Sequence, residues 1–289
     1  MISQVVLPIC LALMMFSMGL SLAISDFKQV LIFPKAVIIG VSLQLIALPL
    51  IAWGIIISTG EFTSLQYSSA VGLIIIAACP SGATSNIIAH LSGGNAALSV
   101  TLTAIISIIT PFILPISLSW QLGLLSSSET MIELPVFKTW MQLIIVTLLP
   151  IAIGMLLHKH NHTWTIKYQS VVSNISALLL FSLIALLVFQ QWTQLQQQAW
   201  QVFYICILLC VLALVACNFV TWLFKFDTKT QQTLAIEVSI QNAGTGIFIA
   251  LAILHQPELA ILPLSYGLLM NIPALMFITQ GFYQRQQTT

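Results

Sequence analysis

Charged residues are scarce in this chain: Asp, Glu, Lys and Arg make up 5% of its 289 residues, whereas hydrophobic residues make up 59%. A soluble domain carries about 25% charged residues, so a surface built from this composition would not stay dispersed in water. The formal net charge is only +1, which gives no basic field to hold nucleic acid. The composition therefore predicts a protein whose solvent is the lipid bilayer.

Alternation of polar and apolar residues is missing as well. The strands of a transmembrane barrel alternate over about ten residues, but the apolar runs here are continuous and about 20 residues long, the length that a helix needs to cross the hydrocarbon core. Helices also satisfy their own backbone polar groups, as lipid requires. We therefore predict an all-α, polytopic membrane protein with about nine transmembrane helices. The expected spans are 2–24, 34–58, 67–90, 95–120, 135–157, 168–190, 199–224, 230–254 and 259–283.

The cysteines form no C-x-x-C motif, and all five lie inside apolar runs. Free cysteines usually act as small buried packing residues, so neither a disulfide framework nor a redox motif is predicted. The run His158-Lys159-His160-Asn161-His162 has no carboxylate or cysteine partner nearby in the sequence. We interpret it as a solvated loop instead of a metal site. No cofactor and no obligatory protein partner are expected.

The few charged residues sort by side once nine spans are assumed. Nine spans put the termini on opposite sides, and Lys and Arg are enriched in cytoplasmic connections. With Arg285 and the C-terminus in the cytoplasm, six lysines fall on that side: Lys28, Lys35, Lys159, Lys167, Lys225 and Lys229. Lys138 and four carboxylates then fall outside: Glu61, Glu129, Glu133 and Glu258. We expect a multi-pass protein of the cell inner (plasma) membrane, with the N-terminus outside and the C-terminus cytoplasmic.

Glu237 is the one charged residue left inside a predicted span. A carboxylate at membrane depth costs several kcal/mol unless it is paired, and it marks a functional site by default. Lys35 and Lys138, at the ends of their predicted spans, belong with the connections, and no Lys or Arg lies in the interior of another span to form a salt bridge with Glu237. The possible partners of Glu237 are therefore a proton, a hydrogen-bond network or an inorganic cation.

A second unusual segment lies in the third predicted span. Pro80 and Gly82 break the hydrogen-bond ladder in the middle of the apolar run. Oxygen-bearing side chains follow at 84–86, and the next span adds Ser99 and Thr103, which are spaced i, i+4 on one helical face. An interrupted span followed by a regular one occurs in each half of the chain. That arrangement is typical of inverted-repeat transporters, whose broken helices meet near the midplane of the membrane.

The chemistry of these segments favours a hard cation and an anion. Half-helix N-termini present N–H groups and a positive dipole end to an anion. Hydroxyl, amide and carbonyl oxygens suit a hard cation, and sodium accepts neutral oxygen ligands with few carboxylates. Proton coupling through Glu237 alone is the alternative, but it would not explain so many oxygen-bearing side chains.

At these segments the chain resembles the bile acid:sodium symporter family. The matching stretches are 78–86, 95–103 and 236–242, together with 18–22, 25–27 and 44–49. The resemblance implies two inverted repeats of five helices, a panel domain and a core domain, and two broken helices that cross in the core. This chain starts at what resembles the second family helix, so its repeats would be 1–120 with four spans and 133–285 with five. Panel and core would each draw on both repeats.

The resemblance also implies ligand sets. One sodium ion would be held by Ser85, Asn86, Ser99, Thr103 and Glu237. A second would be held by Gln44, Glu237, Gln241 and backbone carbonyls near Val238 and Ile240. The substrate would lie near Thr84, Asn242 and Asn271.

Substrate-facing positions depart from the family pattern. The family's common Pro-Gly-Gly-Thr-Ala-Ser-Asn reads Pro-Ser-Gly-Ala-Thr-Ser-Asn at 80–86, so the hydroxyl moves from position 83 to Thr84, and Met270 stands where some bile-acid-binding members have His. The sodium ligands are intact. We therefore expect a sodium-coupled symporter of an organic anion, either bile-acid-like or a smaller carboxylate such as pyruvate or pantoate. The alternatives are a proton-coupled or antiporting carrier on the same fold and a non-transporting sensor. An enzyme is disfavoured because no second intramembrane carboxylate or metal motif is present.

Overall fold

The computed structural model describes residues 2–59, 67–82, 84–125 and 134–288. Within these ranges the regular structure is helical, and the extended pairing consists of one isolated bridge between Ser81 and Gln241. The all-α prediction is therefore confirmed for the described residues. Glu61, Glu129 and Glu133, which were predicted to lie on the outer side, fall outside them.

The helices follow one another with short connections. The first half contains α1 (Ile2–Ser21), α2 (Ile24–Lys28), η1 (Gln29–Leu31), α3 (Pro34–Ser42), η2 (Leu43–Ala47), α4 (Leu48–Ser58), α5 (Tyr67–Ala78), α6 (Thr84–Ser92) and α7 (Ala96–Leu125). The second half contains α8 (Val136–Leu143), η3 (Ile144–Leu148), α9 (Leu149–His160), α10 (His162–Gln190), α11 (Trp192–Leu223), α12 (Thr228–Ser239), α13 (Ala243–Phe248), η4 (Ile249–Ile253), η5 (Pro257–Ala260), α14 (Ile261–Leu269) and α15 (Asn271–Thr288).

Six helices in the described part of the chain are long and apolar enough to cross a membrane. The pair Val5–Ser21 and Ile24–Leu31, bent by 72°, becomes a seventh if it is counted as one span, and Tyr67–Ala78 and Ala243–Ile253 are shorter apolar helices. A polytopic membrane protein is thus confirmed. This count includes only long, continuous helices. A span that is broken in the middle is not counted, and each half of the chain has one, so the predicted number of nine spans is not tested.

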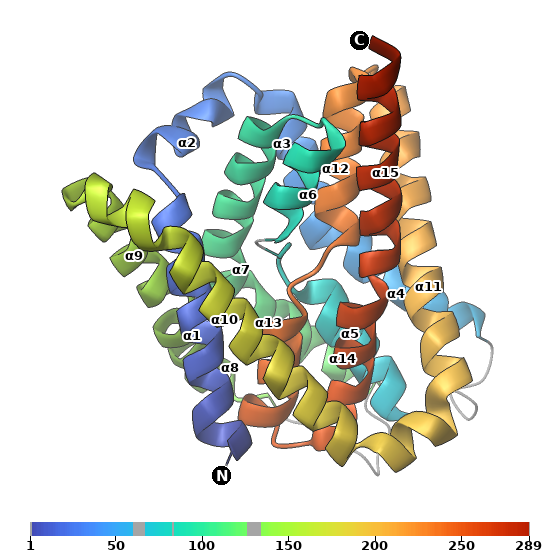
Figure 1. Ribbon diagram of the computed structural model, residues 1–289. Coiled ribbons are helices and arrows are strands. Elements are labelled where there is room, and N and C mark those ends of the chain that lie inside the picture. The colour runs from blue at the N-terminus through green and yellow to red at the C-terminus, as the bar shows by residue number, and fades with distance from the viewer. Residues whose placement is uncertain (1, 60–66, 83, 126–133, 289) are drawn as a thin grey trace.

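Two interrupted helices cross near the centre of the molecule, between α5 and α6 and between α12 and α13 (Figure 1). At the crossing the Gly82 N–H donates to the Ile240 carbonyl at 3.1 Å, and the Asn242 N–H donates to the Pro80 carbonyl at 2.8 Å. Pro80 has no N–H of its own and ends the helical ladder. Backbone groups freed in one break are therefore satisfied by the other, which is what burial away from water demands.

Widened π turns occur at η2, η3 and η4. The first two end two residues before a proline, Pro49 and Pro150. A proline ring clashes with the carbonyl four residues earlier, and a π turn, which is frequent at functional sites, relieves that crowding. The η2 turn contains Gln44, which is buried at 1% exposure.

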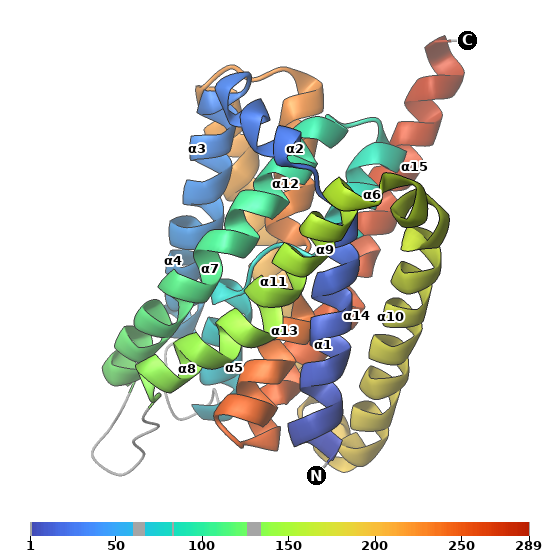
Figure 2. The same ribbon diagram turned by 90° about the vertical axis from the view of Figure 1, so that its left-hand side faces the viewer.

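One group of helices, which we call the α1 bundle, consists of α1, the continuous α8–η3–α9 helix and α10. In it α1 packs against both α9 and α10 (Figures 1 and 2). A Cβ on Gly19 would lie 2.3 Å from the Ile151 carbonyl oxygen, and one on Gly154 would lie 2.5 Å from that of Phe16. Both positions therefore need glycine, and α1 and α9 pack backbone against backbone.

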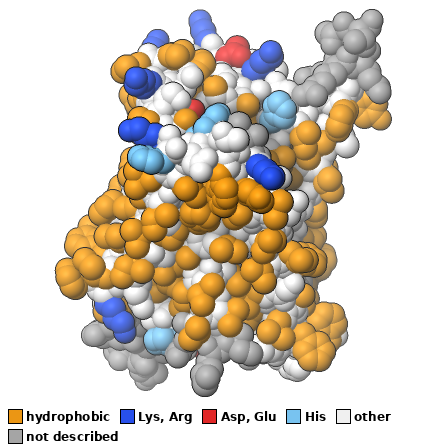
Figure 3. Space-filling view, turned by 60° about the vertical axis from the view of Figure 1, so that its left-hand side comes forward, with side chains coloured by type: hydrophobic (Ala, Val, Ile, Leu, Met, Phe, Trp, Pro, Cys, Tyr) orange, Lys and Arg blue, Asp and Glu red, His pale blue; other side chains and the backbone are white. Residues whose placement is uncertain are grey.

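The second group, which we call the crossover bundle, consists of α3–η2–α4, α5, α6, α7 and α11 to α15, and it holds the crossing point. Figure 3 shows a band of hydrophobic side chains across one face of the molecule, with most Lys, Arg and His side chains gathered beyond one edge of the band. Lys28, Lys35 and Lys229 lie in α2, α3 and α12. Figure 1 places α2 and the start of α12 at the end where the C-terminus lies.

Candidate functional site

Glu237 lies in the last turn of α12, immediately before the crossing, with 1% of its side chain exposed. Its carboxylate is held by hydroxyl groups from two other helices. Ser85 Oγ of α6 donates to Oε1 at 2.7 Å, Ser99 Oγ of α7 donates to Oε1 at 2.5 Å, and Thr103 Oγ1 of α7 donates to Oε2 at 3.0 Å. The i, i+4 spacing of Ser99 and Thr103 puts both hydroxyls on the face of α7 that meets α12.

Asn86 completes this group. Its Oδ1 atom lies 2.9 Å from Ser99 Oγ and 3.1 Å from Thr103 Oγ1. The structure thus brings together all five residues of the first predicted sodium set, from α6, α7 and α12. Their ligand atoms are oxygens of hydroxyl, amide and carboxylate groups, a donor set that suits a hard cation. Sodium binding at this point stays a prediction.

The second predicted set is linked by its own hydrogen bonds at the crossing. Gln44 Nε2 donates to Gln241 Oε1 at 2.5 Å and to the Cys79 carbonyl at 2.8 Å. Gln241 Nε2 donates to the Val238 carbonyl at 2.7 Å, and the Ile240 carbonyl accepts the Gly82 N–H in the crossing. Gln44, Gln241 and the two carbonyls are therefore gathered, whereas the hydrogen bonds of the Glu237 carboxylate go to the first set.

The three predicted substrate residues differ in burial and in hydrogen bonding. Asn242 is buried, and its Oδ1 accepts the Thr245 N–H at 3.1 Å, which caps α13. Asn271 is exposed, and its Nδ2 donates to the Gly267 and Leu268 carbonyls of the preceding turn. Thr84 is exposed at the start of α6 and lines a cavity. Thr84 therefore faces a cavity, whereas the side chains of Asn242 and Asn271 bond backbone groups nearby in the chain.

That cavity has a volume of about 190 Å³ and lies between α1, α6, α7 and α10. We call it the inner cavity. Asn86 belongs both to its lining and to the Glu237 cluster, so it links the two. The polar residues that α1 and α10 contribute to this cavity were not predicted from the sequence: Ser17, Ser21, Gln169, Ser173 and Ser176. Their spacings of three and four residues were a readable signal of one polar face on each helix.

Comparison with known proteins identifies relatives. The model of the Sodium Bile acid symporter family matches residues 8–198. The chain is 30% identical over 257 residues to the uncharacterized sodium-dependent transporter YocS of Bacillus subtilis, covering 89% of this chain and 76% of the relative. It is 28% identical over 252 residues to the probable sodium/metabolite cotransporter BASS2, chloroplastic, of Oryza sativa subsp. japonica, covering 87% and 58%.

A third relative is the human ileal sodium/bile acid cotransporter, to which the chain is 31% identical over 183 residues, covering 62% of this chain and 50% of the relative. The chain thus spans little more than half the length of several curated relatives. The family match includes the first crossing helix, with Pro80, Ser85 and Asn86, and the hydroxyls of α7. On these matches, the chain belongs to the sodium bile acid symporter family.

Proposed function

We propose that this protein is a sodium-coupled symporter that moves an organic anion across the cell inner (plasma) membrane by alternating access. The observation that carries the proposal is the buried Glu237 carboxylate, whose partners are neutral hydroxyls from α6 and α7. A carboxylate at membrane depth without a paired cationic side chain is costly. A bound cation removes that cost, and the oxygen ligands around Glu237 favour sodium.

Coupling follows from the charge balance at the crossing. Two sodium ions around one carboxylate leave the site net positive, and that favours an anion in the adjoining inner cavity. Without the ions, Glu237 would repel the same anion. Each ligand then raises the affinity for the other by the same factor, because such coupling is reciprocal. Asn86, shared by the ion cluster and the cavity, is the direct physical connection.

The inner cavity supports a small carboxylate as the substrate. Its 190 Å³ lies below the roughly 300–1,000 Å³ of pockets that hold drug-sized ligands. Its walls offer hydroxyl and amide groups from Ser17, Ser173 and Gln169 beside the apolar side chains of Met14 and Ile87. A pyruvate-like carboxylate needs such donors and little apolar area, whereas a bile acid needs a longer apolar wall.

Alternating access would be a rigid-body movement of the α1 bundle against the crossover bundle, as panel and core, with nine spans divided into the repeats 1–120 and 133–285. The residues of the inner cavity lie between the crossing and the end of the molecule that carries Lys28, Lys35 and Lys229. Lysine-rich ends face the cytoplasm, so the N-terminus is outside and the state described here faces inward.

The test is thermal unfolding of detergent-purified protein titrated with NaCl, KCl or choline chloride at constant ionic strength. A ligand that binds only the native state stabilises it by about 2.7 kcal/mol at a hundredfold excess over Kd. We expect a saturable rise in Tm with sodium alone that disappears in Glu237→Gln and persists in Glu258→Gln, whose carboxylate is exposed. Uptake of radiolabelled pyruvate and of cholate into proteoliposomes under a sodium gradient then separates the two substrate classes.

One combination of results would contradict sodium coupling. Equal Tm curves in the three salts, with uptake driven by a pH gradient instead of a sodium gradient, would replace this proposal by a proton-coupled carrier on the same fold.

A further inference from the structure

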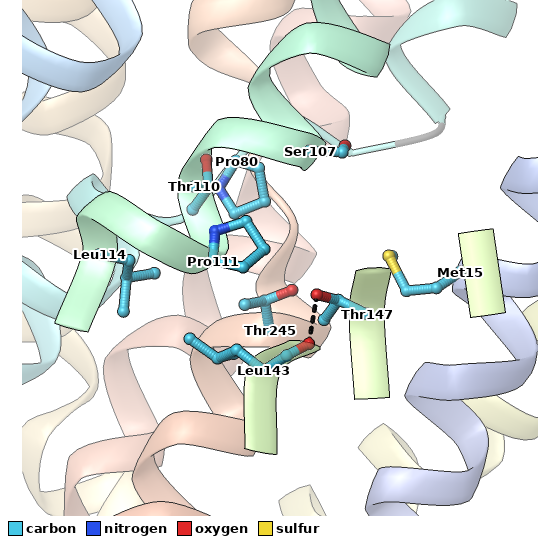
Figure 4. Close-up of a pocket in the computed structure, with 9 residues that line it drawn as sticks. All are labelled: Met15, Pro80, Ser107, Thr110, Pro111, Leu114, Leu143, Thr147 and Thr245. Carbon is cyan, nitrogen blue, oxygen red and sulfur yellow. Dashed lines mark hydrogen bonds between the residues drawn. The ribbon is translucent and has the colours of Figure 1, made fainter. Parts of the chain in front are cut away.

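A second cavity lies at the crossing and is lined by buried residues only (Figure 4). We call it the closed cavity. Its volume is about 10 Å³, which is about the room of one water molecule. The α1 bundle contributes Met15, Leu143 and Thr147, and the crossover bundle contributes the rest: Pro80, Ser107, Thr110, Pro111, Leu114 and Thr245. The closed cavity is therefore a seam between the two bundles.

Two hydroxyls of this seam are buried and have no hydrogen-bond partner within the described structure. They are Thr110 Oγ1 and Thr245 Oγ1, on side chains that are each 2% exposed. Across the cavity, Thr147 is satisfied, because its Oγ1 donates to the Leu143 carbonyl at 2.6 Å (Figure 4). An unsatisfied buried hydroxyl costs free energy. The missing partners of Thr110 and Thr245 therefore need an explanation in the function of the seam.

The chemistry of the lining points to an oxygen acceptor with an apolar body. The polar side chains that line it all end in hydroxyls, which donate hydrogen bonds, and the lining includes no carboxylate, Lys or Arg. The remaining walls are hydrocarbon and a thioether, from Met15, Leu114 and Leu143 among others. A carboxylate group on a small organic molecule fits both kinds of surface, and one water molecule fills the volume that is left when the seam is shut.

We propose that Thr110 and Thr245 form the outer binding position for the carboxylate of the transported anion. The position opens when the α1 bundle moves away from α7 and α13 and collapses when the outer side closes. This inference rests on the proposed function and adds two binding residues to it. In the state described here the two hydroxyls have lost the partner that they hold in the outward-facing state.

Cysteine accessibility tests the opening without knowledge of the substrate. Thr110→Cys and Thr245→Cys are reconstituted in proteoliposomes with the N-terminal side out and treated externally with the impermeant anion (2-sulfonatoethyl) methanethiosulfonate. We expect labelling about tenfold or more faster than in the unmodified protein, whose five cysteines are buried, and than in Thr139→Cys, a fully buried position of α8 that does not line the seam. Labelling no faster than in these two controls overturns the proposal.

Removal of the hydroxyls tests binding. In Thr110→Val and Thr245→Val we expect the half-saturating external concentration of pyruvate to rise about tenfold each, the usual effect of a lost hydrogen bond to a charged group. Thr139→Val is the matched control, because its hydroxyl is equally buried and bonds the Pro135 carbonyl. An unchanged external half-saturation in both valine variants overturns the proposal, since the hydroxyls would then be packing groups only.

Sodium-dependent stabilisation keeps the two proposals apart. If the seam binds the anion, Thr110→Val and Thr245→Val keep the sodium-dependent rise in Tm. Loss of that rise in the two variants would mean that the seam binds the cation, and would overturn the inference. If the unmodified protein itself shows no sodium response, the proposed function fails, and the outer position fails with it.

Discussion

Two buried clusters of hydroxyls lie at the helix crossing, and they differ in whether the protein supplies an acceptor. Around Glu237, Ser85, Ser99 and Thr103 all donate to one carboxylate. Around the closed cavity, Thr110 and Thr245 donate to nothing in the described structure. Residue type and burial are alike in both clusters, so the difference lies in the built-in acceptor. The hydroxyls of the first cluster have their acceptor within the protein, whereas those of the second would receive one from the anion that we propose.

The clusters also differ in which bundles build them. Glu237 and its donors come from α6, α7 and α12, which pack on one another within the crossover bundle. The closed cavity is shared by α1, α8 and η3 on one side and by α7 and α13 on the other. A rigid-body movement between the bundles therefore preserves the first cluster and separates the second. On our proposal, the ion cluster would therefore stay intact while the outer anion position opens and closes.

The largest effect is expected when the built-in acceptor is removed. Glu237→Leu removes three hydrogen bonds to a carboxylate, each worth about 1.5–3 kcal/mol. Asn86 Oδ1 remains as the second acceptor of Ser99 and Thr103, and we expect a total loss of stability of several kcal/mol. Thermal unfolding in sodium-free buffer measures it, and Glu258→Leu serves as the exposed control. A Glu237→Leu protein as stable as the unmodified one would mean that the cluster is not held by its carboxylate.

The difference between the two clusters predicts different changes in the free energy of unfolding for two similar substitutions in α7. Ser99→Ala removes a hydrogen bond to a carboxylate and is expected to lower the free energy of unfolding by about 1.5–3 kcal/mol. Thr110→Val removes a buried hydroxyl that has no partner, so stability is expected to stay the same or to rise by up to about 1 kcal/mol. Thermal unfolding of both variants in one detergent decides the matter. A loss of stability in Thr110→Val as large as that in Ser99→Ala would erase the distinction between the clusters.

The uncharged pair of Gln44 and Gln241, also in the crossover bundle, shows how much a hydrogen bond without a charge stabilises the crossing. Gln44 and Gln241 hydrogen-bond each other without any charge. Because they are in direct contact, a double-mutant cycle of Gln44→Leu and Gln241→Leu should give an interaction energy of about 0.5–3 kcal/mol. The measurement is thermal unfolding without sodium. Additive losses would show that the two amides are satisfied independently of each other.

The sequence predicted the Glu237 cluster better than the closed cavity for a physical reason. A carboxylate in an apolar run and a proline in the middle of a span conflict with a simple membrane helix, and both conflicts were visible at Glu237 and Pro80. Ser99 and Thr103 followed from helical spacing. Thr110 and Thr245 conflict with nothing locally, because a Ser or Thr in a membrane helix ordinarily bonds its own backbone. Their lack of partners depends on how two bundles meet.

Other features were equally invisible in the sequence. The hydrogen bonds from Asn271 Nδ2 to the carbonyls of its own turn are one example, and its place beside the substrate stays a prediction. The π turn that brings Gln44 inward depends on crowding by Pro49. Periodicity carries no signal for either. The fold class was readable because composition and run length determine it, whereas side-chain direction at a helix crossing is set by packing.

The smallest effect concerns the other carboxylate of α12, at its exposed end. Asp227 caps the helix, with Oδ2 accepting the Thr230 N–H at 3.3 Å, and the hydrogen bonds from Thr230 hold the pKa of Asp227 below its usual value. Asp227→Ala should cost at most about 1 kcal/mol, because an exposed cap is weak and screened. A lowered pKa in the folded protein means that this contribution is present above about pH 4 and is lost as the pH falls below it. Thermal unfolding of the unmodified protein and of Asp227→Ala should therefore show a difference in Tm that is smaller near pH 3 than at pH 7. A difference of the same size at both pH values would mean that the charge of Asp227 plays no part in the cap.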